Sequence, residues 1–256
     1  MRVVILAGGK GSRLSEETDL KPKPMVDIGG RPILWHIMKH YAHYDFREFF
    51  VALGYKGELV KRYFLDYCSL LGSMSINLSN GKIVTHDRER EEWVVHLMDT
   101  GVETNTGGRI KRLESWLKDD TFMVTYGDGL SDVNVHDLLI FHRSHGLAAT
   151  VTAVRPPARF GDLVIEGDRV VQFTEKPQTG EGWINGGFFV FDRRLFHYLS
   201  GDDTSLEANA LTDLAADGEL AAYRHEGFWQ CMDTLRDVRT LESLWKSTTP
   251  PWKVWK

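Results

Sequence analysis

Short apolar runs alternate with segments of helical period along most of this chain. Residues 2–7 form a continuous run rich in valine and isoleucine, which is typical of a strand buried on both faces. Similar runs predict strands at 49–53, 121–126 and 149–154, and helical periods at 33–38, 59–71 and 135–145 separate them. This alternation predicts an α/β fold, a Rossmann-like and mostly parallel sheet flanked by helices.

The alternation changes in two stretches, where short apolar runs follow one another with no helix between them. Residues 75–100 form the first stretch and include a run at 93–97. Residues 163–192 form the second, with a Gly-Asp turn at 167–168 that is typical of a hairpin. Both predict small antiparallel β insertions beside the parallel core. Further strands of the second stretch are expected at 163–165, 170–173 and 186–191, and helices then return at 195–199, 206–216 and 235–245.

No internal repeat and no linker is visible, so residues 1–256 are expected to fold as a single domain. Pro250 and Pro251 disfavour a helix at the end of the chain. Trp252 and Trp255 in the arm 248–256 predict that this arm docks on the body or on a neighbouring subunit.

Composition and charge exclude several classes of protein. The chain holds 31 Lys and Arg against 36 Asp and Glu, a formal net charge of −5, which argues against nucleic acid as a partner. No apolar run approaches the roughly 20 residues of a membrane helix. Residues 1–9 resemble a signal peptide only weakly, because the apolar run at 3–7 is short and Lys10 follows it. We therefore expect no membrane partner and a cytoplasmic location.

Cysteine and histidine give no convincing metal or nucleophile motif. Cys68 and Cys231 are too few for a disulfide framework and are expected to be inert core residues. His36 and His40 are four residues apart, but the zinc motif needs Glu at position 37, which is isoleucine.

The first strand runs directly into a glycine-rich loop. Glycine allows close approach to a ligand, successive backbone N–H groups can cradle an anion, and an arginine fork can bind phosphate oxygens. The loop therefore predicts a nucleoside triphosphate at the carboxyl ends of the strands. A glycine-rich turn without a ligand is the alternative. The segment consists of Leu6, Ala7, Gly8, Gly9, Lys10, Gly11, Ser12 and Arg13.

Two familiar phosphate loops do not fit this segment. The dinucleotide fingerprint needs a third glycine where the chain has Leu14. A P-loop needs Ser or Thr after Gly9-Lys10, where the chain has Gly11. Hydride-transfer enzymes and P-loop kinases are accordingly disfavoured.

Charged residues in two rigid or tight segments suggest partners for the phosphates. Prolines stiffen the segment that carries Lys21 and Lys23, which suits a leaving pyrophosphate. A surface turn with solvated lysines is the alternative. Asp128 follows a buried strand between two glycines and is a candidate Mg²⁺ ligand, although Gly-Asp-Gly is also a plain turn. Asp233 precedes a helix and is either an N-cap, a metal ligand or both.

Taken together, these segments resemble the sugar-1-phosphate nucleotidyltransferases, whose glycosyltransferase-A-like fold agrees with the predicted α/β sheet. The resemblance extends over essentially the whole chain. Its motifs are residues 6–13, 15–18, 21–25, 99–101, 106–109, 126–129, 160–161, 175–177, 184–189 and 227–234.

The resemblance implies a role for each matching residue. Loop 6–13 and Lys23 would bind the nucleotide, Thr104 and Arg109 would hold it near its base, and Gly127 would close on it. The implied Mg²⁺ ligands are Asp128 and Asp233, the sugar hydroxyl contacts are Glu175 and Asn185, and the sugar phosphate contact is Lys176. Two positions depart from the family pattern: Thr104 stands where Ser is common, and Cys231 stands where Pro is expected.

Within the family, the chain is most similar to the members that join CTP and glucose 1-phosphate, which implies CDP-glucose and pyrophosphate as products. Arg13, Lys23 and Asp128 would be the catalytic residues, Mg²⁺ the cofactor, and a homo-oligomer the assembly. The alternatives are the same chemistry with another nucleotide or sugar phosphate, and a sensor that binds sugar nucleotides without turning them over. A sensor would not need Arg13, Lys23, Asp128 and Asp233, all of which are present.

Overall fold

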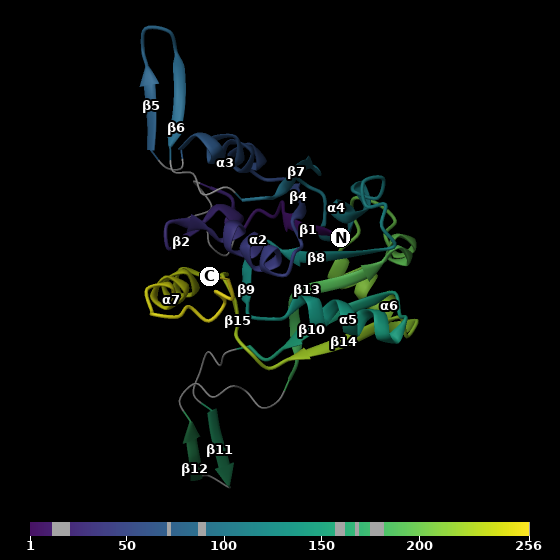
Figure 1. Cartoon of the computed structure of the whole chain (residues 1–256). Helices are drawn as coiled ribbons and strands as arrows, with labels where there is room; N and C mark the ends of the chain where they lie inside the picture. Colours follow the sequence, from purple (N-terminus) through teal and green to yellow (C-terminus); the bar gives the residue numbers. More distant parts are fainter. Residues whose placement is uncertain are drawn as a thin grey trace.

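A seven-stranded sheet with the order β14-β10-β13-β8-β1-β4-β7 is the centre of the fold (Figure 1). The computed structural model describes residues 1–11, 21–70, 73–86, 91–156, 162–166, 169–174 and 182–255. The strands of the sheet are β1 (Arg2–Ala7), β4 (Glu48–Leu53), β7 (Val94–Asp99), β8 (Thr121–Tyr126), β10 (Ala149–Val154), β13 (Ile184–Asp192) and β14 (Leu220–His225).

The sheet is mostly parallel, as the sequence predicts. β1 pairs in parallel with β4 and with β8, β4 with β7, and β10 with β14. Along β1, Val3 and Ile5 belong to one apolar cluster, whereas Val4 and Leu6 belong to the other. Both faces of the strand are therefore covered, which explains its uninterrupted apolar sequence.

Helices cover both faces of the sheet. One apolar cluster takes residues from α2 (Ile33–His43), α3 (Gly57–Leu70), α5 (Val135–His145) and α7 (Leu235–Trp245). The other takes residues from α4 (Thr106–Arg112), η3 (Arg193–Tyr198), η4 (Leu206–Ala210) and α6 (Leu211–Ala216). A short turn of 3₁₀ helix, η2 (Lys23–Met25), lies within the lysine-proline segment. Among the helices that the structure describes, none is both long enough and apolar enough to cross a membrane.

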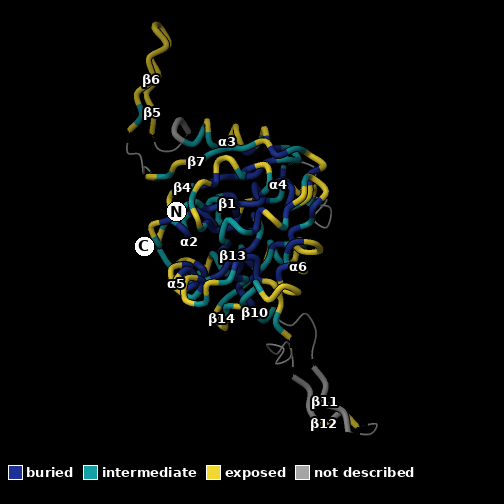
Figure 2. Tube along the Cα trace, turned by 90° about the vertical axis from the view of Figure 1, so that its right-hand side faces the viewer, coloured by how far each residue is buried: buried dark blue, intermediate teal, exposed yellow. Residues whose placement is uncertain are grey.

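Four two-stranded antiparallel sheets accompany the central sheet. The two longer ones confirm the predicted insertions, and in Figure 1 they lie away from the central sheet at its two ends. Figure 2 shows that the hairpin of β5 and β6 is exposed along its length. The pairs are β2 (Asp27–Ile28) with β3 (Arg31–Pro32), β5 (Ser73–Asn77) with β6 (Lys82–His86), β9 (Gly129–Ser131) with β15 (Trp229–Cys231), and β11 (Asp162–Glu166) with β12 (Arg169–Thr174).

Two strands differ from the sequence prediction. Residues 93–97 are expected in an antiparallel insertion, which is wrong, because β7 lies parallel to β4 at the edge of the central sheet. Its residues are partly buried or exposed, because β7 is the edge strand of the sheet. Residues 186–191 are expected beside the core, but β13 lies inside the sheet, antiparallel to β8 and β10.

Tryptophan side chains tie the C-terminal arm to the body. Trp252 is fully buried, its ring stacks on Trp245 and Phe228, and its Nε1 donates to His36 Nδ1 at 3.4 Å. Gly29 has a positive φ of 61°, and a Cβ there would lie 1.9 Å from Trp245 Nε1. This close approach leaves no room for a side chain at position 29. The Gly29 N–H also donates to Glu242 Oε1 at 2.8 Å, which attaches α7 to the body.

Candidate active site

The strand order creates a crevice at the carboxyl end of β1. From β1 the sheet extends through β4 to β7 on one side, and the chain then returns to place β8 on the other side. Open α/β sheets bind ligands at such a reversal. The Gly127 N–H donates to the Leu6 carbonyl at 3.0 Å, so the glycine-rich loop and the segment after β8 lie side by side.

A cavity of about 390 Å³ opens at this reversal and is called here the loop cavity. Its volume is within the range of small-molecule sites. It gathers predicted residues from widely separated parts of the sequence. They are Leu6, Ala7, Gly9, Gly11, Lys23, Thr104, Arg109, Gly127, Asp128 and Asp233.

Some predicted nucleotide contacts are placed differently or lie outside the described residues. Gly8 does not line the loop cavity, and its carbonyl accepts a hydrogen bond from Arg109 Nη2 at 3.0 Å. The Lys10 ammonium pairs with Glu103 at 2.8 Å, in a pair that is largely exposed, and Lys10 does not line the cavity. The predicted residues outside the described ranges are Ser12, Arg13, Glu175 and Lys176.

A small sheet brings the two candidate metal acids together. In the antiparallel pair of β9 and β15, Cys231 lies opposite Gly129. The next backbone hydrogen bond runs from the Met232 N–H to the Asp128 carbonyl at 2.8 Å. Asp128 and Asp233 therefore flank the same end of this sheet although they are far apart in the sequence.

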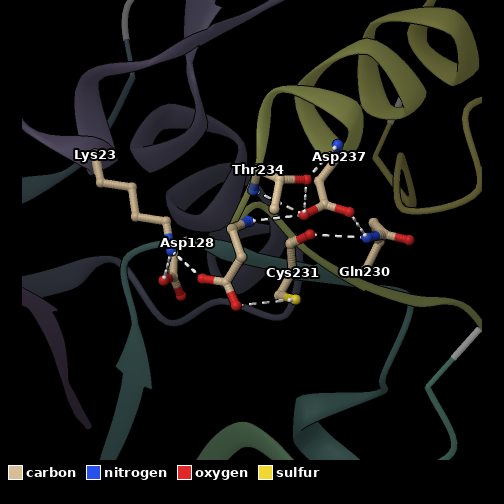
Figure 3. Close-up of polar contacts among 7 residues, drawn as sticks. Lys23, Asp128, Gln230, Cys231, Thr234 and Asp237 are labelled. Atoms are coloured by element: carbon tan, nitrogen blue, oxygen red, sulfur yellow. Dashed lines mark hydrogen bonds and ion pairs between the residues drawn. The ribbon is translucent and has the colours of Figure 1, made fainter. Parts of the chain in front are cut away.

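Lys23 lies between these two acids. Its Nζ is 2.6 Å from Asp128 Oδ2 and 2.5 Å from Asp233 Oδ1, and Figure 3 shows the contact with Asp128. Burial lowers the pKa of the Lys23 ammonium, but the two carboxylates raise it by more, so the net shift is upward and the group stays charged. Only 11% of the Lys23 side chain is exposed. Lys23 is therefore not solvated, as a plain surface turn would have required.

The helix cap next to Asp233 is supplied by its neighbour. Thr234 is the N-cap of α7, and it forms a reciprocal capping box with Asp237. The Asp237 carboxylate also accepts from the Asp233 N–H at 3.1 Å, as part of the network in Figure 3. The N-cap alternative for Asp233 is therefore wrong, and its carboxylate faces Lys23 instead.

The pair of acids has the donor set that Mg²⁺ prefers. Among the described residues, no group of three or more His, Cys, Asp or Glu side chains gathers in a way that could hold a metal ion. Mg²⁺ does not need one, since it is usually bound by one or two carboxylates together with substrate phosphates and water. The carboxylates of Asp128 and Asp233 both contact the Lys23 ammonium, so they are close enough together to share one cation. This placement fits a metal ion that arrives bound to a substrate phosphate.

Cys231 adjoins this pair without the properties of a nucleophile. Its thiol donates to Asp233 Oδ2 at 3.8 Å. Burial, and next the negative charge of Asp233, raise the pKa of the thiol to about 11. The thiol is therefore protonated at neutral pH, in agreement with the expectation of an unreactive residue.

Arg109 lies beneath the glycine-rich loop and joins the ends of three strands. Its guanidinium donates to the carbonyls of Gly8 after β1, Leu53 in β4 and Gly101 after β7. Burial, and next the charge of Arg112, lower its pKa below the ordinary value. These bonds give Arg109 a structural role that the sequence does not reveal, alongside the predicted contact with a nucleotide.

Gly8→Ala is expected to lower the free energy of unfolding by about 3 kcal/mol, because a Cβ at this position overpacks a filled site. That Cβ would lie 2.2 Å from Arg109 Cζ, where the guanidinium is held by several carbonyls. Gly9→Ala is the matched control, since a Cβ at Gly9 has no neighbour within 4 Å. Urea unfolding of both variants measures the difference, and equal stability would show that the packing beneath the loop is loose.

A second cavity of about 280 Å³, called here the side cavity, adjoins the loop cavity. Asn185, one of the predicted sugar contacts, lines it together with Trp229, whose Nε1 donates to the Gly186 carbonyl at 2.7 Å. Asp128 and Asp233 line both cavities. The two acids therefore lie at the wall that the cavities share, where a group could pass from one ligand to another.

Comparison with known proteins identifies the family. The family model described as nucleotidyl transferase matches residues 2–249. The chain belongs to this family. Among its relatives, the glucose-1-phosphate cytidylyltransferase of Salmonella typhi is 47% identical over the full length of both chains. The probable glucose-1-phosphate cytidylyltransferase of Bacillus subtilis is 45% identical, also over the full length of both.

Solved structures show the same fold at low sequence identity. HddC from Yersinia pseudotuberculosis superimposes with a TM-score of 0.67 at 22% identity, over 96% of this chain and 99% of its own. A putative glucose-1-phosphate thymidylyltransferase from Bacillus anthracis superimposes with a TM-score of 0.66 at 19% identity, over 97% of this chain and 96% of its own. The nucleotidyl transferase fold predicted from the sequence is thus confirmed.

Several residues of this nucleotidyl transferase site escape the sequence argument. Pro24, Asn105, Thr106 and Tyr126 line the loop cavity, although the sequence argument gives them no role. Pro24, Thr106 and Tyr126 belong to motifs that carry the family resemblance, and Asn105 immediately precedes one, so the motifs held a signal for them. Glu207, which bonds to Thr106 and Tyr126, has no such signal, because only the fold brings it there.

Proposed function

We propose that this nucleotidyl transferase transfers the cytidylyl group of CTP to α-D-glucose 1-phosphate, giving CDP-glucose and pyrophosphate. Two full-length relatives with 45–47% identity carry the name glucose-1-phosphate cytidylyltransferase. The mannose-1-phosphate guanylyltransferase catalytic subunit beta of Danio rerio is only 31% identical, and the match covers 63% of that protein. The observation that carries the proposal is the pair Asp128 and Asp233 at the wall between two cavities.

In this proposal, the nucleotide occupies the loop cavity and the sugar phosphate occupies the side cavity. A phosphate oxygen of glucose 1-phosphate attacks the α-phosphorus of CTP. The new bond joins that oxygen to the α-phosphorus, and the bond from the α-phosphorus to the pyrophosphate oxygen breaks. Such transfers need alignment and neutralisation of charge more than covalent help from the protein.

The residues of the chain supply that alignment. The backbone N–H groups of the loop with Gly9 and Gly11 would hold the phosphates, and the Lys23 ammonium lies beside them in the same cavity. Asp128 and Asp233 would hold Mg²⁺, which supplies neutralisation of phosphate charge when bound. Enzymes of this family generally use a divalent metal ion.

The remaining roles rest on the family resemblance. Arg13 is proposed to bind the departing pyrophosphate, Glu175 a sugar hydroxyl, and Lys176 the sugar phosphate. Thr104 is buried at the wall of the loop cavity, which supports its proposed contact near the base.

Release of pyrophosphate from purified protein tests the proposal. With glucose 1-phosphate as acceptor, kcat/KM for CTP should exceed that for UTP, dTTP and GTP by at least about tenfold, because hydrogen-bonded base sites reject the wrong pattern of donors and acceptors. A preference for another nucleotide would support the same chemistry with a different substrate. Binding of CDP-glucose without pyrophosphate release from any pair would support a sensor.

The proposed homo-oligomer has support from one exposed surface. Leu78, Ile76 and Ile83 on the hairpin of β5 and β6 are 90%, 51% and 60% exposed. Contiguous exposed apolar side chains often mark contact surfaces. The cytoplasmic location stays a prediction.

A further inference from the structure

The phenol of Tyr126 is held by hydrogen bonds from both sides. Tyr126 is the last residue of β8 and lines both the loop cavity and the side cavity. Its hydroxyl donates to Glu207 Oε1 at 2.6 Å and accepts from Asn185 Nδ2 at 3.1 Å. A phenol carries its proton at neutral pH, so the hydroxyl is the donor in its bond to the Glu207 carboxylate.

These bonds leave the Asn185 amide with a single orientation. Its Oδ1 accepts from the Gly187 N–H at 2.8 Å, while its Nδ2 donates to Tyr126. One N–H of Nδ2 is therefore committed to Tyr126, and the other is the group of this amide that can serve a ligand in the side cavity. Gly187 supports the arrangement, because with φ at +80° its backbone packs against the Tyr126 ring, where a Cβ would lie 2.5 Å from Cδ2.

Glu207 extends the same network to the nucleotide side. Its Oε2 accepts from the Thr106 hydroxyl at 2.6 Å and from the Ser205 hydroxyl at 2.9 Å. Thr106 begins α4 and lines the loop cavity. Both carboxylate oxygens of Glu207 are thus used, one toward Tyr126 and the other toward the loop cavity.

We propose that Tyr126 and Glu207 are positioning residues that orient the Asn185 amide toward a hydroxyl of the sugar phosphate. The inference rests on the proposed function, because it takes the side cavity as the sugar site. Tyr126 acts through Asn185, and Glu207 acts through Tyr126. Hydrogen bonds run without interruption from Thr106 through Glu207 and Tyr126 to Asn185, and they connect the walls of the two cavities.

Tyr126→Phe tests this inference, because it removes the hydroxyl and keeps the ring that packs on Gly187. KM for glucose 1-phosphate should rise roughly tenfold, the effect of one lost hydrogen bond to the substrate, while KM for CTP changes less than about twofold. Tyr198→Phe is the matched control, since the Tyr198 hydroxyl also donates to a carboxylate, Asp217 at 3.0 Å, and lines neither cavity. That control should leave both KM values unchanged.

A double variant distinguishes positioning from general loosening of the fold. If Tyr126 acts through Asn185, Tyr126→Phe should add little once Asn185→Ala is present, so the double variant should match Asn185→Ala in KM for glucose 1-phosphate. Glu207→Gln keeps an oxygen acceptor and should stay near wild type, whereas Glu207→Ala should resemble Tyr126→Phe. This rescue by the conservative variant is not expected of a residue that only stabilises the fold.

Other outcomes overturn the inference. Multiplicative effects in the double variant, an equal rise of KM for both substrates in Tyr126→Phe, or an unchanged KM in Asn185→Ala would each contradict it. Failure of the proposed function is recognised separately, since the wild-type protein would then release no pyrophosphate from CTP and glucose 1-phosphate. That result would remove the function and this inference together.

Discussion

Asp128→Asn is expected to lower kcat for pyrophosphate release by about 1,000-fold, equivalent to about 4 kcal/mol of activation free energy. The carboxylate contributes half of the negative charge that the acid pair offers to a metal ion, and an amide oxygen is a neutral and weaker ligand. The fold should survive, because the change is isosteric and Asp233 keeps its bond to Lys23. Steady-state rates at saturating Mg²⁺, with circular dichroism of the variant, measure both effects.

Asp120→Asn is the matched control for this variant. Asp120 is an exposed residue immediately before β8, at the opposite end of the strand from Asp128. The Asp120→Asn variant undergoes the same change in charge as Asp128→Asn and is expected to keep the wild-type kcat for pyrophosphate release. Near-normal turnover of Asp128→Asn at saturating Mg²⁺ would remove Asp128 as a metal ligand.

Lys23→Met is expected to lower the free energy of unfolding by about 3 kcal/mol in metal-free buffer, because breaking a largely buried ion pair leaves uncompensated charge. The uncompensated groups are the carboxylates of Asp128 and Asp233, both mostly buried. Adding Mg²⁺ should narrow the difference from wild type, since the cation restores the missing positive charge. Urea unfolding with and without Mg²⁺ measures this, and kcat/KM should fall about 100-fold because a phosphate contact is also lost.

Lys21→Met provides the stability control in the same segment. Lys21 pairs with Asp27 at 2.7 Å, where the side chains are 29% and 50% exposed. Surface pairs of this kind contribute at most about 1 kcal/mol. Two results would show that Lys23 does not neutralise the two acids. One is wild-type stability of Lys23→Met in metal-free buffer, and the other is a loss of unfolding free energy that is the same with and without Mg²⁺.

The elements that the sequence predicts best are those whose burial is uniform along their length. β1 and β10 are covered on both faces, so each appears in the sequence as a continuous apolar run. α5 has its buried residues at helical spacing, so it too can be recognised from its own sequence alone. β14 is an edge strand with mixed exposure and is not predicted. α4 is also missed, because Gly107 and Gly108 within it are poor helix formers.

For the site residues too, the sequence predicts what depends on local sequence and misses what depends on distant contacts. Lys23, Asp128 and Asp233 are found from the sequence because each belongs to a compact motif with distinctive chemistry. Their mutual distances are not found, since these depend on the pairing of β9 with β15. Glu207 is missed for a related reason, because an isolated acid at the start of η4 gains its meaning only from contacts across the fold.

The central claim is that Asp128 and Asp233 together hold a divalent metal ion at the wall between the nucleotide and sugar cavities. Crystals grown with CTP and Mn²⁺ in place of Mg²⁺ test it directly, because Mn²⁺ scatters anomalously. The account predicts one anomalous peak in contact with both carboxylates and with a phosphate oxygen of the nucleotide. A peak that touches only one of the two acids, or neither, would contradict it.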